Sequence, residues 1–192
     1  MHQEYLDQLA RCLRDTKVYD RQGTAVEGYE EAIECMVQLF SSVKQAKKNV
    51  FFIGNGGSAA IAIHMTADFM KNGGMRTVSL YNNSVMTCMA NDYGYENVFS
   101  SPLELLAREG DLLVAISSSG NSPNIVNAVN TALKKGMQII TFSGFRRENR
   151  INSMGDYNVH VPVSHYGIVE SIHNLILQQM VDTILERGGQ CL

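Results

Sequence analysis

The sequence lacks the features of exported, membrane-spanning or nucleic-acid-binding proteins. Its four cysteines lie far apart, at Cys12, Cys35, Cys88 and Cys191. They form no Cys-x-x-Cys pair, and no apolar export segment begins the sequence, so we expect a reducing, cytoplasmic location. No apolar run approaches the roughly 20 residues that a membrane-spanning helix needs. The formal net charge of -3 also leaves no basic surface for nucleic acid.

Three familiar loop motifs are absent as well. There is no Gly-x-x-x-x-Gly-Lys-Ser/Thr segment, which excludes the usual nucleoside triphosphate loop. Ala59 stands where a dinucleotide-binding loop beginning at Gly54 would have its third glycine, so no nucleotide cofactor is expected. Gly-x-Ser-x-Gly, the nucleophile turn of many hydrolases, is missing too.

The order of apolar runs predicts an α/β fold. With 192 residues, 45% of them hydrophobic, the chain can bury one sizeable core, and we expect a single domain over residues 1–192. Alternating strands and helices predict a doubly wound, mainly parallel five-stranded sheet flanked by helices. The expected strands are 50–53, 77–80, 112–116, 138–142 and 157–161, and the expected helices between and after them are 58–71, 84–91, 97–108, 122–135 and 167–187.

Two further helices, 3–19 and 25–48, are expected before the first strand. The second of them has apolar residues at helical spacing, including Ile33, Met36 and Phe40. A minimal doubly wound sheet has no place for these helices. We therefore divide the domain into an N-terminal helical oligomerisation segment, 1–48, and an α/β core, 49–187.

Two loops of small residues are the strongest functional signal. Gly54–Ser58 follows the first expected strand and Ser117–Ser122 follows the third. Loops at the carboxyl ends of parallel strands bind ligands in open α/β sheets. Glycine lets the backbone approach a ligand, and serine hydroxyls and helix N-terminal amides donate to anions. Either loop alone could merely turn the chain, but two together predict a phosphate cradle.

Six segments occur in the order and spacing of the sugar isomerase (SIS) domain: Gly54–Ser58, His64, Ala90–Gly94, Glu109–Asp111, Ile116–Ser122 and Gly136–Gly144. On these motifs the chain resembles the phosphoheptose isomerase branch of that family over residues 30–185. The resemblance implies an isomerase that converts sedoheptulose 7-phosphate into a heptose 7-phosphate. This is the first step toward nucleotide-activated heptose for lipopolysaccharide or capsule. It also implies a cytoplasmic homotetramer that often binds zinc.

The resemblance assigns substrate contacts to both loops and to the Asn-Asp-Tyr-Gly segment. The expected phosphate ligands are Ser117, Ser118, Ser119 and Ser122. The other expected substrate contacts are Asn55, Gly56, Gly57, Ser58, Asn91 and Asp92. Pro123 fits the first turn of the helix that follows the serines, because its missing N–H costs nothing there.

The acid–base residues depart from the family pattern. His64 and Asp68 stand where the family has histidine and glutamate, and the C-terminal helix has Glu170 and Gln178 in place of glutamine and a catalytic histidine. His173 lies one turn after Glu170 and shares a helix face with it. The predicted catalytic residues are therefore Glu170, as the base, with Asp68, His64 and His173. The alternatives are a solvated helix face for Glu170 and a core position for His64.

His64, Asp68, Glu170 and Gln178 are also the candidate metal ligands. One imidazole and several oxygens could bind zinc or another divalent ion. The alternative is a site that holds no metal. The loss of the C-terminal histidine keeps a second function open. That alternative is a non-catalytic phosphosugar-binding or scaffold protein, as in the related initiator-associating proteins of bacterial replication, which have this fold without the isomerase residues.

Overall fold

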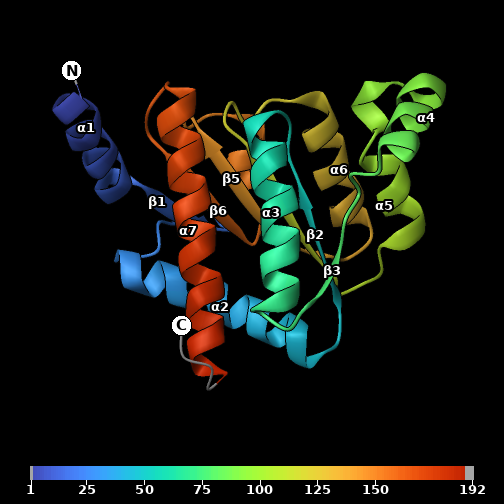
Figure 1. Cartoon of the computed structure of the whole chain (residues 1–192), viewed down its shortest axis with the longest axis horizontal. Helices are drawn as coiled ribbons and strands as arrows, with labels where there is room; N and C mark the ends of the chain where they lie inside the picture. The colour runs from blue at the N-terminus through green and yellow to red at the C-terminus, as the bar shows by residue number, and fades with distance from the viewer. Residues whose placement is uncertain (1, 189–192) are drawn as a thin grey trace.

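A computed structural model of the chain, which describes residues 2–188, contains one six-stranded sheet with helices on both faces (Figure 1). The strand order is β1-β6-β5-β4-β2-β3, and all neighbouring strands are parallel except β1 and β6. The mainly parallel α/β fold is therefore confirmed, with six strands in place of five. The strands are β1 (Lys17–Asp20), β2 (Asn49–Ile53), β3 (Arg76–Val78), β4 (Leu112–Ser117), β5 (Gln138–Gly144) and β6 (Tyr157–Val161).

The helices divide into two layers, each with its own apolar core. Side chains from α2, α3 and α7 pack on one face of the sheet, and α5 and α6 pack on the other. Figure 1 shows α3 and α7 side by side, with α4 and α5 at the opposite end of the sheet from α1. The helices are α1 (His2–Asp15), α2 (Tyr29–Gln45), α3 (Gly57–Lys71), α4 (Asn83–Tyr93), α5 (Ser100–Leu106), α6 (Pro123–Lys134) and α7 (Tyr166–Arg187), with short 3-10 turns η1 (Tyr95–Asn97) and η2 (Arg150–Ser153).

The sixth strand lies at the end of the segment expected to be the first helix. That helix, α1, ends at Asp15, and β1 then pairs antiparallel with β6, Val18 lying opposite Val159. Val18 and Tyr19 are buried. Their β-branched and aromatic side chains favour the strand, and pairing covers the otherwise open edge of β6.

The apolar stripe of α2 is buried within the chain itself. Met36 and Phe40 are 0% exposed, and the Phe40 ring lies 4.5 Å from that of Phe69 on α3. The stripe that suggested an oligomerisation role is thus covered on the flank of the chain's own sheet, where α2 packs beside α3 and α7. The expected role of residues 1–48 in oligomerisation loses that support.

The topology brings the two small-residue loops together. β2 and β4 are parallel neighbours, and the chain leaves them in opposite directions, β2 connecting to β3 and β4 to β5. Such a reversal opens a crevice at the carboxyl ends of the strands. The loops after Ile53 and Ser117 lie at this crevice, and α3 and α6 begin there. Within residues 2–188, no helix combines the length and apolar character needed to span a membrane.

Candidate active site

A cavity of about 240 Å³ lies at this crevice between the two loops and the first turns of α7. All four predicted residues of the first loop and all four predicted serines line it, together with Glu170. Ile116 and Tyr166 also line it, although neither was predicted as a site residue. The complete lining is Asn55, Gly56, Gly57, Ser58, Ile116, Ser117, Ser118, Ser119, Ser122, Tyr166 and Glu170.

The serine loop has hydrogen-bonding groups left free for a ligand. The Ser118 hydroxyl is buried and has no hydrogen-bond partner among residues 2–188. Ser122 precedes α6 as its N-cap without making a side-chain capping bond, and its hydroxyl lies 3.3 Å from that of Ser117. Pro123 has no N–H and the Ile125 N–H donates to the Ser122 carbonyl at 3.1 Å, so what α6 itself contributes is the positive end of its helix dipole, which favours an anion. This part of the cavity therefore suits a phosphate group.

A neighbouring loop supports the serine loop from outside the cavity. Gly120 has a positive φ of 65°, and the amide of Asn149 occupies the space that a side chain at Gly120 would need. Gly120 also accepts a hydrogen bond from the Ile151 backbone N–H at 3.2 Å. Glycine is therefore required at position 120, and the loop conformation is fixed before any ligand binds.

Tyr81 holds the beginning of the first loop. Its hydroxyl accepts a hydrogen bond from the Gly54 N–H at 2.6 Å and donates to the Gly54 carbonyl at 2.8 Å. Burial raises the pKa of the Tyr81 phenol, which keeps it neutral and able to donate. One hydroxyl thus satisfies both backbone groups of a residue next to the cavity.

Asn55, the next residue, is tied to the serine side of the cavity. Its amide Nδ2 donates to Asn124 Oδ1 at 2.9 Å, and Asn124 Nδ2 donates back to Asn55 Oδ1 at 2.8 Å. The Tyr95 hydroxyl donates to the same Asn55 oxygen at 3.1 Å. Asn124 is buried in the first turn of α6. The reciprocal amide pair therefore links the two loops across the cavity.

Glu170 brings a carboxylate to the cavity from the first turns of α7. The carboxylate lies against Gly57, the first residue of α3, in the space where a side chain at position 57 would lie. Burial raises the pKa of Glu170. A carboxyl group with a raised pKa is better matched to taking up and returning protons near neutral pH.

His64 and Asp68 lie elsewhere. They are further along α3, with His64 Nε2 3.3 Å from Asp68 Oδ2, and neither lines the cavity. At 1.5 Å per residue, His64 is about 10 Å along the helix from Gly57. Asn91 and Asp92, near the end of α4, hydrogen-bond to each other at 2.8 Å and also lie outside the cavity lining.

His173 is a core residue. It is 0% exposed, its Nε2 lies 3.0 Å from the Ser143 carbonyl, and its ring packs edge-on against Phe142. Its Nδ1 has no partner, and burial lowers its pKa to about 4. The imidazole is therefore neutral at physiological pH and separated from the cavity that holds Glu170.

The four candidate metal ligands do not converge. Gln178 Nε2 donates to Asp182 at 3.2 Å, Glu170 lies against Gly57, and His64 pairs with Asp68. Among residues 2–188, no three His, Cys, Asp or Glu side chains are grouped so as to hold a metal ion. The donor set present in one chain therefore does not fit the zinc site that the resemblance implied, and a metal is not confirmed.

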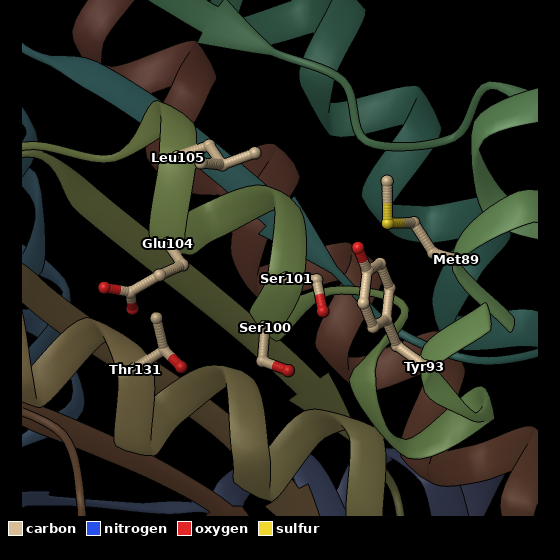
Figure 2. A pocket seen from close by; sticks show the side chains of 7 residues that line it. All are labelled: Met89, Tyr93, Ser100, Ser101, Glu104, Leu105 and Thr131. Carbon is tan, nitrogen blue, oxygen red and sulfur yellow. The ribbon is translucent and has the colours of Figure 1, made fainter.

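A second hollow, of about 390 Å³, lies between α4, α5 and α6. Figure 2 shows Met89 and Tyr93 on one side of it and Glu104 and Thr131 on the other. Its lining contains a carboxylate and no basic side chain. Neither of the two predicted loops lines this hollow, so the predicted substrate contacts gather at the smaller cavity instead.

Three residues that shape the cavity were not predicted from sequence: Tyr81, Asn124 and Tyr166. A signal existed for Asn124, because an amide directly after Pro123 falls in the first turn of the helix that follows the serines. Tyr81 and Tyr166 carry no motif. Their contribution depends on folding, which brings Tyr81 to Gly54 and stands the Tyr166 ring edge-on against Phe145.

Comparison with known proteins agrees with this geometry. The sequence model of the SIS domain family matches residues 15–144. The phosphoheptose isomerase of Proteus mirabilis is 32% identical over 195 residues, covering 96% of this chain and 94% of the relative. That of Edwardsiella ictaluri is 36% identical over 149 residues, covering 75% of this chain and 76% of its own.

Solved structures are similar over almost the whole chain. The phosphoheptose isomerase of Neisseria gonorrhoeae superposes with a TM-score of 0.80 at 29% identity, covering 94% of this chain and 95% of that one. That of Francisella tularensis gives a TM-score of 0.81 at 23% identity, covering 96% of each, which supports the fold alone. The chain therefore belongs to the SIS domain family and, within it, to the phosphoheptose isomerases.

Proposed function

We propose that this protein is an aldose–ketose isomerase that converts sedoheptulose 7-phosphate into a heptose 7-phosphate, for nucleotide-activated heptose and surface polysaccharides. Its curated relatives carry the name phosphoheptose isomerase. The observation that carries the proposal is one cavity containing both a phosphate cradle and Glu170. An anchored phosphate holds the sugar in place, and a base of raised pKa can move the carbon-bound proton of this isomerisation.

The serine loop binds the phosphate. The unpartnered Ser118 hydroxyl and the Ser122 hydroxyl supply donors to its oxygens, and the positive end of the α6 dipole favours its charge. The phosphate does not react, so its binding serves to hold the sugar carbons in a fixed position. Gly56 and Gly57, which also line the cavity, let the sugar pass close to the backbone.

Glu170 moves the carbon-bound proton. The carboxylate takes a proton from C1 of the ketose while a solvent water molecule protonates the C2 carbonyl oxygen, which gives a neutral enediol and hydroxide. The carboxylic acid then returns its proton to C2 while the hydroxide takes the O1 hydroxyl proton, which leaves the aldehyde oxygen and regenerates water. Burial of Glu170 favours this exchange because its raised pKa lies nearer the working pH.

His64, Asp68, Asn91 and Asp92 remain predicted site residues without a place in this cavity. We derive no step through a metal ion, because His64, Asp68, Glu170 and Gln178 form no common donor set in one chain. We also assign no proton transfer to His173, because its buried, neutral ring contacts the Ser143 carbonyl.

We further propose a cytoplasmic homotetramer. Helix α4 has no buried residue, and Tyr93 and Leu105 are 60% and 82% exposed beside the hollow of Figure 2. Exposed apolar surface of this kind supports contact with another copy of the chain. Cys12, Cys35 and Cys88 form no disulfide with one another in the described part of the chain, which fits a reducing compartment, and Cys191 lies outside that part.

The test is turnover by the purified full chain. With sedoheptulose 7-phosphate, with and without added divalent metal, we expect an aldose product in both cases. In D2O the product should carry deuterium at C2, because the transferred proton exchanges with solvent from the carboxyl group. Binding of the sugar phosphate without any aldose would instead establish the scaffold function.

A further inference from the structure

The hydrogen bonds around Asn55 determine which of its groups can reach a ligand. The backbone N–H of Ile125 donates to Asn124 Oδ1 at 3.0 Å and to the Ser122 carbonyl at 3.1 Å. A backbone N–H can only donate, so this contact identifies the oxygen of the Asn124 amide. The other end of that amide, Nδ2, must then be the group that donates to Asn55 at 2.8 Å.

The orientation of the Asn55 amide follows from that of Asn124. Its Oδ1 receives hydrogen bonds from Asn124 Nδ2 at 2.8 Å and from the Tyr95 hydroxyl at 3.1 Å, which uses both of its lone pairs. Its Nδ2 donates one of its two hydrogens to Asn124 Oδ1 at 2.9 Å. A single Nδ2 hydrogen is left. Because Asn55 lines the cavity, the side chain can offer a ligand a donor and no acceptor.

We propose that Asn124 and Tyr95 are positioning residues, which hold the Asn55 amide so that its free N–H donates to the carbonyl oxygen of the bound ketose. This rests on the proposed function. Asn55 precedes Gly57 by two residues, the Glu170 carboxylate lies against Gly57, and all three residues line one cavity. Negative charge develops on that oxygen when Glu170 removes the C1 proton, and a fixed donor stabilises it.

The arrangement is preorganised because Asn124 is buried while Asn55 is partly exposed. A free asparagine can rotate its amide and offer either oxygen or nitrogen. Here rotation of one amide would place its oxygen against the other oxygen and its NH2 group against the other NH2 group, so both hydrogen bonds of the reciprocal pair would be lost. The cost of leaving such buried groups unpaired keeps one orientation.

The test compares Asn55→Ala, Asn124→Ala and the double variant. If one donor binds the ketose oxygen and acts on the developing oxyanion, Asn55→Ala should lower kcat by about 10²-fold and raise KM by only roughly fivefold. Asn124→Ala should lower kcat nearly as much, and the double variant should be no slower than Asn55→Ala. Asn130→Ala, at an exposed site of the same helix, is the control with unchanged kcat.

Tyr95→Phe tests the proposal without disturbing the core, because Tyr95 is 56% exposed. It should lower kcat by up to roughly tenfold, the value of one hydrogen bond. Tyr93→Phe, two residues away and 60% exposed, is its control. Unchanged kcat in both Asn124→Ala and Tyr95→Phe, or effects that multiply with that of Asn55→Ala, would overturn the proposal.

Calorimetry separates this proposal from the proposed function. The ratio of affinities for sedoheptulose 7-phosphate and inorganic phosphate reports sugar contacts and requires no turnover. Asn124→Ala and Tyr95→Phe should each reduce the ratio, by roughly fivefold for one hydrogen bond, with unchanged phosphate affinity. If the parent chain forms no aldose but the affinity ratio falls in both variants, the isomerase function is refuted and the positioning role stands. An unchanged affinity ratio in both variants would refute the positioning role.

Discussion

The carboxylate of Glu170 fills the space beside Gly57 that the side chain of any other residue would occupy. Glu170 belongs to α7 and Gly57 is the first residue of α3, so this contact joins the two helices at the edge of the cavity. Gly57 therefore has a second role besides letting the sugar approach the backbone. It makes room for the proposed base.

Gly57→Ala should displace the Glu170 carboxylate and reduce kcat by at least about tenfold, because small misplacements of a base are costly. The fold should persist, since the displaced group is the end of a flexible side chain. Steady-state kinetics and circular dichroism measure the two effects. Gly188→Ala, just beyond the far end of α7, should leave kcat unchanged. Full activity in Gly57→Ala would show that the contact does not place the base.

Ser118→Ala and Ser122→Ala should weaken binding of inorganic phosphate, because each removes a hydroxyl from the cradle. Ser118→Ala should also leave the phosphate-free protein no less stable, because its buried hydroxyl has no partner to lose. Calorimetry and thermal unfolding measure these effects, with Ser153→Ala, at an exposed residue outside the cavity, as the control. Unchanged phosphate affinity in both variants would remove the loop from the site.

The loops could be predicted from sequence because their signals are local. Val50–Ile53 and Leu112–Ile116 are apolar runs of strand length, and Gly54–Ser58 and Ser117–Ser122 follow them directly. Parallel pairing then places both loops at one edge without further information. Strand β1 was missed because Val18 and Tyr19 continue a helical pattern, and only pairing with β6 makes them a strand.

The acid–base residues could not be placed by spacing alone. Glu170 and His173 are three residues apart, and that spacing predicts one shared helix face. In the structure Glu170 contacts Gly57 in α3, whereas His173 contacts Ser143 in β5. Helix α7 packs against both elements, so neighbouring positions on its surface enter different environments. Which of them reaches the cavity depends on tertiary packing.

Acidification should destabilise the protein through His173. Its folded-state pKa of about 4 lies below the ordinary value of 6.5, so between these values the unfolded chain binds more protons. The stability due to the neutral ring is present above pH 6.5 and is lost as the pH falls toward 4, by at most on the order of 3 kcal/mol. Urea unfolding at pH 7.5 and 5.0 should show a smaller decrease for His173→Gln than for the parent chain. Equal decreases would contradict this assignment.

Glu170→Gln should raise the unfolding temperature at pH 7.5. Burial raises the folded-state pKa of Glu170 above 4.5, so ionisation of this group costs stability at neutral pH. The contribution of the neutral carboxyl group is present below pH 4.5 and is lost as the pH rises through the folded-state pKa. The gain should therefore be absent at pH 4. Glu186→Gln, exposed near the end of the same helix, should show no such pH-dependent gain.

The most direct test of the account is the rate at which Glu170→Gln converts sedoheptulose 7-phosphate, compared with the unmodified chain. The amide preserves the shape of the side chain and loses the basic oxygen, so kcat should decrease by about 10²- to 10⁴-fold. Affinity for inorganic phosphate should stay the same, because the serine loop is unchanged. An unmodified chain that forms aldose and a Glu170→Gln variant that forms it equally fast would contradict the central claim that Glu170 is the base.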